Sequence, residues 1–192
     1  MRLTALALSL LLAAPATAET LLSAVAGNWA GPSNTGAYFR AELSWTQGEE
    51  ANRLRIWNSP DPSSAGELDF DNTAISLGAF ARVQKLAVVD TADGSILEVI
   101  TEFADEEAEG RVVMQLQYID SRYKVVGYQF QELLYNEPED PIPTECVLDL
   151  RNGTATVNGM PRDLPPLDSE AVNASGWDFS TAFKRGYCPR NN

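Results

Sequence analysis

The feature of this sequence that most constrains its fold is a two-residue alternation of apolar and polar side chains through the middle of the chain. The alternation is clearest in residues 37–46, where one set of alternate positions reads Ala37, Phe39, Ala41, Leu43 and Trp45. Successive side chains of a β-strand point to opposite faces, so this pattern predicts an antiparallel strand with one buried face. After a polar turn, residues 53–56 alternate arginine with leucine or isoleucine, which predicts the return strand of a hairpin.

Further hairpins are predicted along the rest of the chain. Residues 82–89 and 96–103 flank an Asp-Gly pair at residues 93–94, which tight hairpin turns prefer. A second hairpin is expected at residues 111–134, and a third around Asn152-Gly153, the strongest short-range hairpin signal in the sequence. The pattern predicts about eight or nine strands, with no convincing amphipathic helix beyond the N-terminal segment.

These strands predict an all-β fold. We expect a single antiparallel meander that closes into an eight- or nine-stranded barrel, because closure removes exposed strand edges. A β-sandwich is the alternative. The proline-rich stretch at residues 161–166 is expected to end the barrel, and the C-terminal part, about residues 161–192, to wrap back onto it.

The N-terminus has the pattern of a cleaved bacterial signal peptide. Met1-Arg2 is followed by an apolar run at residues 3–14 and by a small-x-small cleavage pattern that ends at Ala18. No cysteine follows the cleavage site, so a lipoprotein is not expected. We therefore expect residues 1–18 to be removed and residues 19–192 to form one β domain in the periplasm or outside the cell.

The chain contains two cysteines, Cys146 and Cys188. An even pair in an oxidising compartment normally forms a disulfide, and no Cys-x-x-Cys pattern or histidine suggests a reactive thiol. We expect this bridge to tether the C-terminal part of the chain.

Charge limits the range of partners. The formal charge of −13 becomes −14 on removal of the signal peptide, because that segment carries one base, Arg2, and no acid. The electric field of this negative charge repels phosphate groups, so nucleic acid is disfavoured as a partner. No apolar run after the signal peptide is long enough for membrane insertion. The negative charge favours a basic exported protein as a partner, and a monomer is expected.

Catalysis is constrained by the absence of histidine. Ser-His-Asp and Cys-His systems and His-ligated zinc are excluded, so we expect no enzyme activity and no cofactor. Two acidic stretches, at residues 69–72 and 105–109, lack the ordered loop of a calcium site, so no metal site is expected. A hydrolase that uses two carboxylates remains an alternative.

Aromatic residues on the predicted strands are the best candidates for binding. Four of them are expected to line the barrel interior and contact a ligand, namely Trp45, Tyr118, Tyr128 and Phe130. Trp57 falls on the opposite face of its strand, beside Arg53 and Arg55, and is the candidate hot spot for a protein partner.

The sequence Gly27-Asn28-Trp29 resembles the Gly-x-Trp that opens many lipocalin-like (calycin) barrels, and the strand pattern from about residue 25 to 157 is of barrel size. The resemblance implies that Trp29 plugs the closed end of the barrel and packs against an arginine from a late strand, for which Arg151 is the candidate. It also implies an open end that holds a small apolar ligand.

Three function classes follow. The first is an exported, non-enzymatic binding protein that holds a small apolar or amphipathic ligand. The second is a protein-binding module, such as an inhibitor of an exported hydrolase or an envelope assembly factor. The third is the carboxylate-based hydrolase, which requires two acids facing each other in a cleft.

Overall fold

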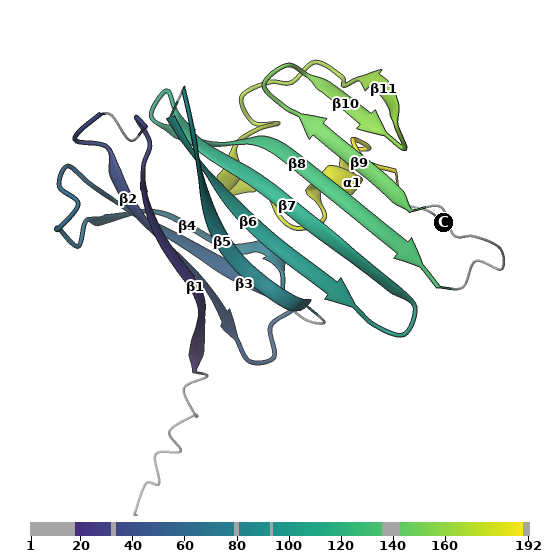
Figure 1. Ribbon diagram of the computed structural model, residues 1–192, viewed down its shortest axis with the longest axis horizontal. Coiled ribbons are helices and arrows are strands. Elements are labelled where there is room, and N and C mark those ends of the chain that lie inside the picture. Colours follow the sequence, from purple (N-terminus) through teal and green to yellow (C-terminus); the bar gives the residue numbers. More distant parts are fainter. Residues whose placement is uncertain (1–17, 32–33, 79–80, 93, 136–142, 190–192) are drawn as a thin grey trace, which may run out of the picture.

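The computed structural model describes residues 18–31, 34–78, 81–92, 94–135 and 143–189 (Figure 1). These residues form eleven antiparallel β-strands in two sheets, followed by a C-terminal segment with one turn of 3-10 helix, η1 (Ala174–Gly176), and one short helix, α1 (Thr181–Lys184). The all-β prediction is confirmed. The predicted signal peptide lies outside the described residues, except for Ala18.

The first sheet contains β1 (Glu19–Asn28), β2 (Tyr38–Thr46), β3 (Ala51–Ser59) and β4 (Glu67–Leu77), in that order. Its inner face follows the predicted alternation, since Ala41, Leu43, Leu54 and Ile56 are fully buried. The predicted hairpin of β2 and β3 is confirmed by direct pairing of Leu43 with Leu54.

The second sheet continues the meander through seven strands. Its members, in spatial order, are β5 (Ala81–Thr91), β6 (Gly94–Ala104), β7 (Ala108–Ile119), β8 (Arg122–Leu134), β9 (Thr144–Asp149), β10 (Thr154–Val157) and β11 (Met160–Asp163). The predicted turn between β7 and β8 is tight, because Asp120 and Ser121 have φ angles of 52° and 60°. The predicted hairpin of β9 and β10 is also present, on either side of Asn152-Gly153. Asp93, from the turn predicted before β6, lies outside the described residues.

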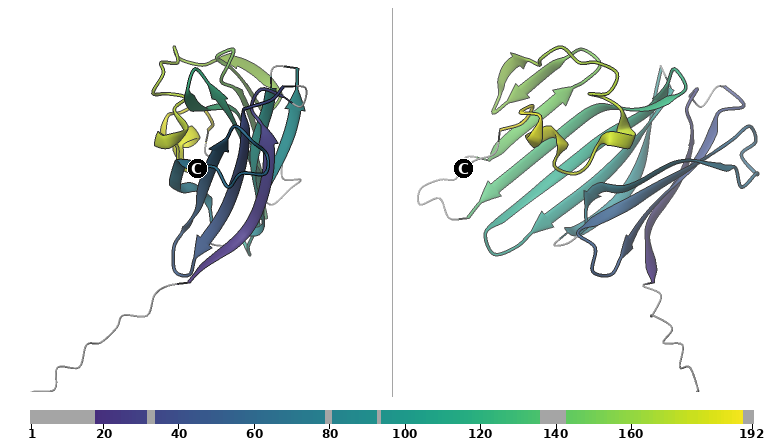
Figure 2. Two further views of the ribbon diagram at one scale, coloured as in Figure 1. Left: turned by 90° about the vertical axis from the view of Figure 1, so that its left-hand side faces the viewer. Right: turned by 180° about the vertical axis from the view of Figure 1, so that it is seen from behind.

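The barrel prediction is wrong, because neither sheet closes on itself in the described part of the chain. The two sheets instead face each other in a sandwich-like arrangement, as the alternative prediction had it (Figure 2). Among the described strands, none pairs with the outer edge of β4, and the C-terminal segment, residues 164–189, covers this edge. Phe179 donates its backbone N–H to the Ala74 carbonyl at 3.2 Å. The buried Asn72 side chain donates to the carbonyls of Ala174 and Trp177 at 2.9 and 2.8 Å.

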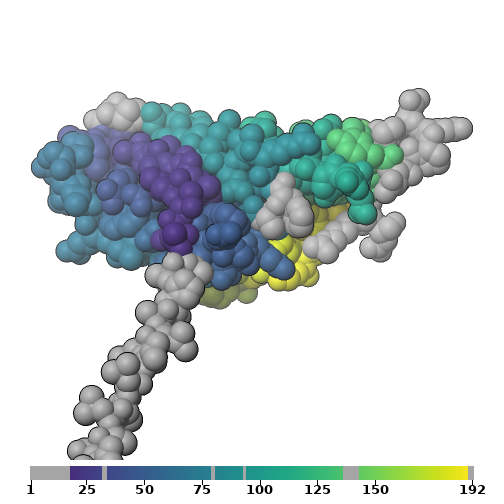
Figure 3. All heavy atoms as spheres, turned by 90° about the horizontal axis from the view of Figure 1, so that it is seen from below, coloured from purple at the N-terminus to yellow at the C-terminus, as the bar shows by residue number. Residues whose placement is uncertain are grey.

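The C-terminal segment packs on the inner face of the second sheet, beside the first sheet. Figure 1 shows this segment in yellow behind the second sheet, the right-hand view of Figure 2 shows it in front of the same sheet, and Figure 3 shows it next to the blue strands of the first sheet. Trp177 is 1% exposed and belongs to the same hydrophobic core as both sheets. Burial of such a large side chain gives this segment a stable position without a strand of its own.

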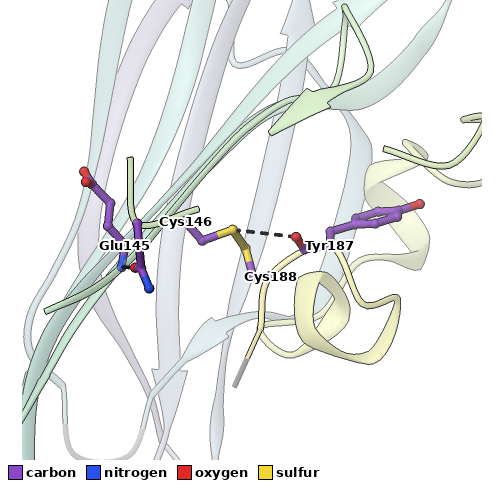
Figure 4. The surroundings of a disulfide bond; sticks show 5 residues. Glu145, Cys146, Tyr187 and Cys188 are labelled. Carbon is purple, nitrogen blue, oxygen red and sulfur yellow. Dashed lines mark hydrogen bonds between the residues drawn. A yellow bond between two sulfur atoms is a disulfide. The ribbon is translucent and has the colours of Figure 1, made fainter. Parts of the chain in front are cut away.

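The predicted disulfide is confirmed (Figure 4). Cys146 in β9 is joined to Cys188 in the C-terminal segment, with 5.7 Å between the Cα atoms. Both cysteines are buried in the core, and the Tyr187 carbonyl oxygen lies 3.8 Å from Cys146 Sγ. The bridge therefore fixes the end of the segment to the inner face of the second sheet.

Candidate ligand-binding cavity

A cavity of about 450 Å³ lies between the inner face of the second sheet, the end of β4 and the C-terminal segment. Its floor consists of alternate side chains of three adjacent strands, namely Val99, Thr101 and Phe103 from β6, Val112 and Met114 from β7, and Phe130 from β8. Because side chains two residues apart share a face, the predicted strand alternation directs these residues inward together. The floor is apolar except for Thr101.

The side walls of the cavity come from parts of the chain that are distant in sequence. Ile75, Ser76 and Leu77 from the end of β4 form one wall, and Phe179 and Phe183 from the C-terminal segment form the other. The cavity therefore exists only when the C-terminal segment is docked on the second sheet.

The rim of the cavity is acidic. Asp105, Glu107 and Glu132 line it where β6 turns into β7 and where β8 ends. The backbone N–H groups of Glu107 and Ala108 both donate to Asp105 Oδ1 at 2.8 Å and lower the pKa of its carboxyl. Asp105 is therefore ionised at neutral pH.

One polar group in the cavity wall has no hydrogen-bond partner. The hydroxyl oxygen of Thr101 is buried, the residue is 2% exposed, and no described group donates to this oxygen or accepts from it. Buried polar atoms in folded proteins are nearly always hydrogen-bonded, so an unpaired hydroxyl in a cavity wall is the expected mark of a site for a polar group of a ligand or for water.

The opposite end of the space between the sheets is closed by aromatic side chains. Trp29 is 5% exposed, and its ring stacks on Phe39 with centroids 3.9 Å apart. Gly27 permits this contact, because a Cβ at that position would collide with the Phe39 ring at 2.6 Å. The indole N–H of Trp29 donates to Asn58 Oδ1 at 3.0 Å. Trp29 thus occupies a closed end in a two-sheet structure.

At this closed end, Asn58 is also hydrogen-bonded to Asp69 and Tyr123. The Asn58 amide donates to Asp69 Oδ2 and to the hydroxyl of Tyr123, both at 2.7 Å, and Tyr123 donates to Asp69 at 2.9 Å. Burial, together with the hydrogen bond to Asp69, strongly raises the pKa of the Tyr123 hydroxyl. Tyr123 therefore acts as a neutral donor.

Arg151 and Trp29 are hydrogen-bonded to different partners. The Arg151 guanidinium donates to Gln117 Oε1 at 2.7 Å, and Asn58 holds the indole nitrogen of Trp29. The indole nitrogen of Trp29 is thus bonded to an asparagine from β3, and packing of Arg151 against the tryptophan, which the resemblance to lipocalins implies, stays a prediction.

The four aromatic residues predicted to contact a ligand lie in different places. Phe130 lines the cavity. Tyr128 is buried beneath Trp177, with ring centroids 6.1 Å apart, and Tyr118 contacts Tyr123 at the closed end, at 4.9 Å. Trp45 is half-buried near the β2–β3 turn, where its indole donates to the Glu49 carbonyl at 2.8 Å. The structure thus brings only Phe130 to the cavity.

Trp57 lies on the outer face of the first sheet and is half-buried. The guanidinium carbons of Arg40 and Arg55 lie 4.6 and 5.8 Å from its ring centroid. Its aromatic face is therefore already engaged in cation–π contacts within the chain.

A smaller polar depression of about 350 Å³ near the closed end contains two acids, Asp69 and Glu170. Oδ2 of Asp69 already accepts from Asn58 and Tyr123. The acidic residues at 69–72 do not converge, because Asp71 pairs with Arg53 and Asn72 turns toward the C-terminal segment. Within the described ranges, no group of three or more metal-ligating side chains is found.

Sequence reasoning missed Thr101, Phe179 and Phe183 as cavity residues. The aromatic residues of the C-terminal segment were a usable signal, because Trp177, Phe179, Phe183 and Tyr187 follow one another in a stretch without strand alternation. Such residues seldom remain exposed together, so they indicate a segment that packs on the core. Thr101 had no comparable signal.

No known protein family matches the chain, and no curated protein or solved structure is significantly similar to it. Among the described residues, no helix has the length and apolar character needed to cross a membrane.

Proposed function

We propose that this chain is an exported, non-enzymatic binding protein that holds a small apolar or amphipathic ligand in the cavity between β4, the second sheet and the C-terminal segment. The observation that carries the proposal is an apolar cavity of about 450 Å³ with the unpaired Thr101 hydroxyl in its wall. Small-molecule sites are typically cavities of roughly 300–1,000 Å³ with a few fixed polar groups, and this cavity has both properties.

The proposal includes export to the periplasm or beyond. The signal-like segment at residues 1–18 and the disulfide between Cys146 and Cys188 support it, because structural disulfides persist in oxidising compartments. The wall of the cavity depends on the segment that this disulfide fixes.

The first test is native mass spectrometry of residues 19–192, produced by export into a bacterial periplasm. A small-molecule adduct that leaves on unfolding is the expected result. A binding assay with an uncharged fluorescent naphthylamine then measures occupancy of the cavity. Saturable binding at one site supports the proposal, and absence of both the adduct and dye binding would contradict it.

A matched pair of variants locates the bound dye. Val112→Phe adds a ring to the floor of the cavity and is expected to reduce dye affinity at least tenfold, because the added volume displaces the ligand. Val89→Phe adds the same ring to an exposed position on β5 and is expected to have no effect. Equal affinities in the two variants would place the dye outside the cavity.

A second candidate function, a protein-binding module, is favoured by Trp57 and its two flanking arginines on an open sheet face. Large aromatic and arginine side chains are enriched at binding hot spots. Trp57→Ala should then abolish a protein complex seen in the native mass spectrum of the wild-type chain, whereas under the ligand-binding proposal it leaves dye binding unchanged.

A further inference from the structure

Three buried polar atoms without partners lie around the point where β4 ends. They are Oδ1 of Asn52, Oε1 of Gln84 and Oγ1 of Thr101, and no described group is hydrogen-bonded to any of them. Asn52 is directly opposite Ser76 of β4, and Gln84 is directly opposite Thr101 of β6. We call these three residues the polar corner. Thr101 lies in the cavity wall, next to the wall formed by Ser76 and Leu77.

The orientation of both amides in the polar corner is determined by their other hydrogen bonds. Asn52 Nδ2 donates to the Leu77 carbonyl at 3.1 Å, and Gln84 Nε2 donates to the Gly78 carbonyl at 2.8 Å. A carbonyl oxygen can only accept, so neither amide can be reversed without losing its bond. The unpaired atoms are therefore two acceptors and one hydroxyl, which can both donate and accept, so acceptors outnumber donors in the polar corner.

The acidic rim also favours ligand groups that donate hydrogen bonds. Asp105, Glu107 and Glu132 surround the entrance, and the whole chain carries a formal charge of −13. Thr101 and Asp105 are four residues apart along β6 and its turn, or about 13 Å at 3.3 Å per residue. A ligand that reaches from the rim to Thr101 thus meets carboxylates at the entrance and approaches the Thr101 hydroxyl inside; Asn52 and Gln84 lie behind it and do not line the cavity themselves.

We propose that the cavity takes single-chain amphiphiles whose polar group is a hydrogen-bond donor, primary alkylamines above all, and rejects the anions of fatty acids. This inference rests on the proposed function of the cavity. A primary ammonium group carries three donors and no acceptor, so it is favoured at either end of this path, by the carboxylates at the rim or by the acceptor-rich polar corner. A carboxylate carries only acceptors, so it is repelled at the rim and can accept only from the Thr101 hydroxyl, which leaves both amide oxygens unpaired.

The test compares three ligands with the same chain on the mature, oxidised protein at pH 7: decylammonium, decanol and decanoate. Displacement of the uncharged naphthylamine dye reports the affinity of each. Decylammonium is expected to bind best and decanoate at least tenfold more weakly. Equal or tighter binding of decanoate overturns the inference but leaves the proposed function intact. Dye binding without displacement by any of the three also overturns the inference, whereas failure of the dye itself to bind overturns the proposed function.

Two conservative variants separate the polar corner from the rim. Thr101→Val keeps the side-chain shape and removes the hydroxyl, so it should weaken decylammonium or decanol binding about 2- to 10-fold and leave dye binding unchanged. Thr156→Val in β10, away from the cavity, is its control. Glu107→Gln should weaken decylammonium and strengthen decanoate, while Glu106→Gln, which is exposed and does not line the cavity, should change neither.

The salt dependence gives an independent measurement for the rim. Raising the ionic strength should reduce the difference in affinity between decylammonium and decanoate, because screening weakens the electrostatic interactions of the exposed carboxylates. If both variants and added salt leave the ligand preference unchanged, the rim and the polar corner do not determine selectivity and the inference fails.

Discussion

Phe183 in α1 packs edge-on against Phe130 in β8, with ring centroids 4.8 Å apart and an interplanar angle of 85°. Edge-to-face packing is a preferred geometry for aromatic pairs. Because α1 has only four residues, it is too short to be stable alone, and its position depends on such contacts. This pair thus joins the C-terminal segment to the second sheet at the wall of the cavity.

The disulfide should contribute substantially to stability and to the cavity. Replacing Cys146 and Cys188 together by serine is expected to lower the free energy of unfolding by about 4 kcal/mol, because the bridge closes a loop of 42 positions. Urea denaturation measures this change, and dye affinity should fall with it. Dithiothreitol should reproduce both effects in the wild type and have no effect on the double variant. Unchanged dye binding in the double variant would show that the cavity wall does not need the bridge.

Asn72 should determine docking of the C-terminal segment. Asn72→Ala leaves the carbonyls of Ala174 and Trp177 without their donor, so we expect a loss of about 2 kcal/mol or more in unfolding free energy. Trypsin cleavage near Lys184 should also become faster. Asn152→Ala removes only an exposed hydrogen bond to Asp149, so it should cost less, about 1 kcal/mol or below, and should not change the cleavage rate near Lys184. Equal cleavage rates in the two variants would argue against this role of Asn72.

Trp29 should contribute more to stability than Trp45, the other tryptophan near an end of β2. Trp29→Ala removes a 5%-exposed side chain from the aromatic cluster and is expected to cost about 3–5 kcal/mol. Trp45→Ala, at a half-buried position, should cost less. Urea midpoints and near-ultraviolet circular dichroism measure the difference, and the prediction fails if the two losses are the same.

Gly94 should not tolerate alanine. Its φ angle is +113°, and a Cβ there would collide with the Trp29 carbonyl oxygen. We expect Gly94→Ala to cost about 2 kcal/mol or more, since backbone strain and a steric clash act together. Gly153 has a φ of +69°, but no atom lies within 4 Å of the Cβ that alanine would add. The expected cost of Gly153→Ala is therefore about 1 kcal/mol, from the backbone conformation alone. Thermal unfolding of the two variants tests whether the contact with Trp29 adds to the effect of φ.

Asp178 should make the stability of the C-terminal segment dependent on pH. Partial burial alone raises the pKa of its carboxyl, but hydrogen bonds from Lys184, Ser180 and Thr181 outweigh this effect and lower the pKa to about 2. A pKa below the unfolded value means that the ionised group stabilises the fold above about pH 4, and that this contribution is lost as the pH falls toward 2.

The Asp178→Asn variant tests this dependence. The difference in urea midpoint between wild type and variant should be largest near neutral pH and should shrink as the pH falls below about 4. A difference that stays constant between pH 7 and pH 2.5 would show that ionisation of Asp178 does not contribute.

The strands and most hairpins were predictable because their signals are local. Alternation placed β2 and β3, and the turns at residues 120–121 and 152–153 were recognised from their residue types. The same reasoning should have found β11, because an Asn-Gly pair, Asn158-Gly159, connects β10 to it. In the structure these two residues have the positive φ angles, 49° and 76°, that such a turn requires. The proline at residue 161 obscured this strand, although an edge strand tolerates proline.

The sequence by itself therefore determined the all-β class, the positions of most hairpins and the cysteine pair, since each depends on residues near one another or on a unique partner. Only the tertiary structure decided that the meander divides into two sheets and that a cavity lies between them. The reason is physical: Asn72 is bonded to carbonyls 102 and 105 residues away, and these bonds place the C-terminal segment where a closing strand would have paired. No periodicity in a chain reports hydrogen bonds over such a distance, so the position of Thr101 in a cavity wall appeared only once the chain was folded.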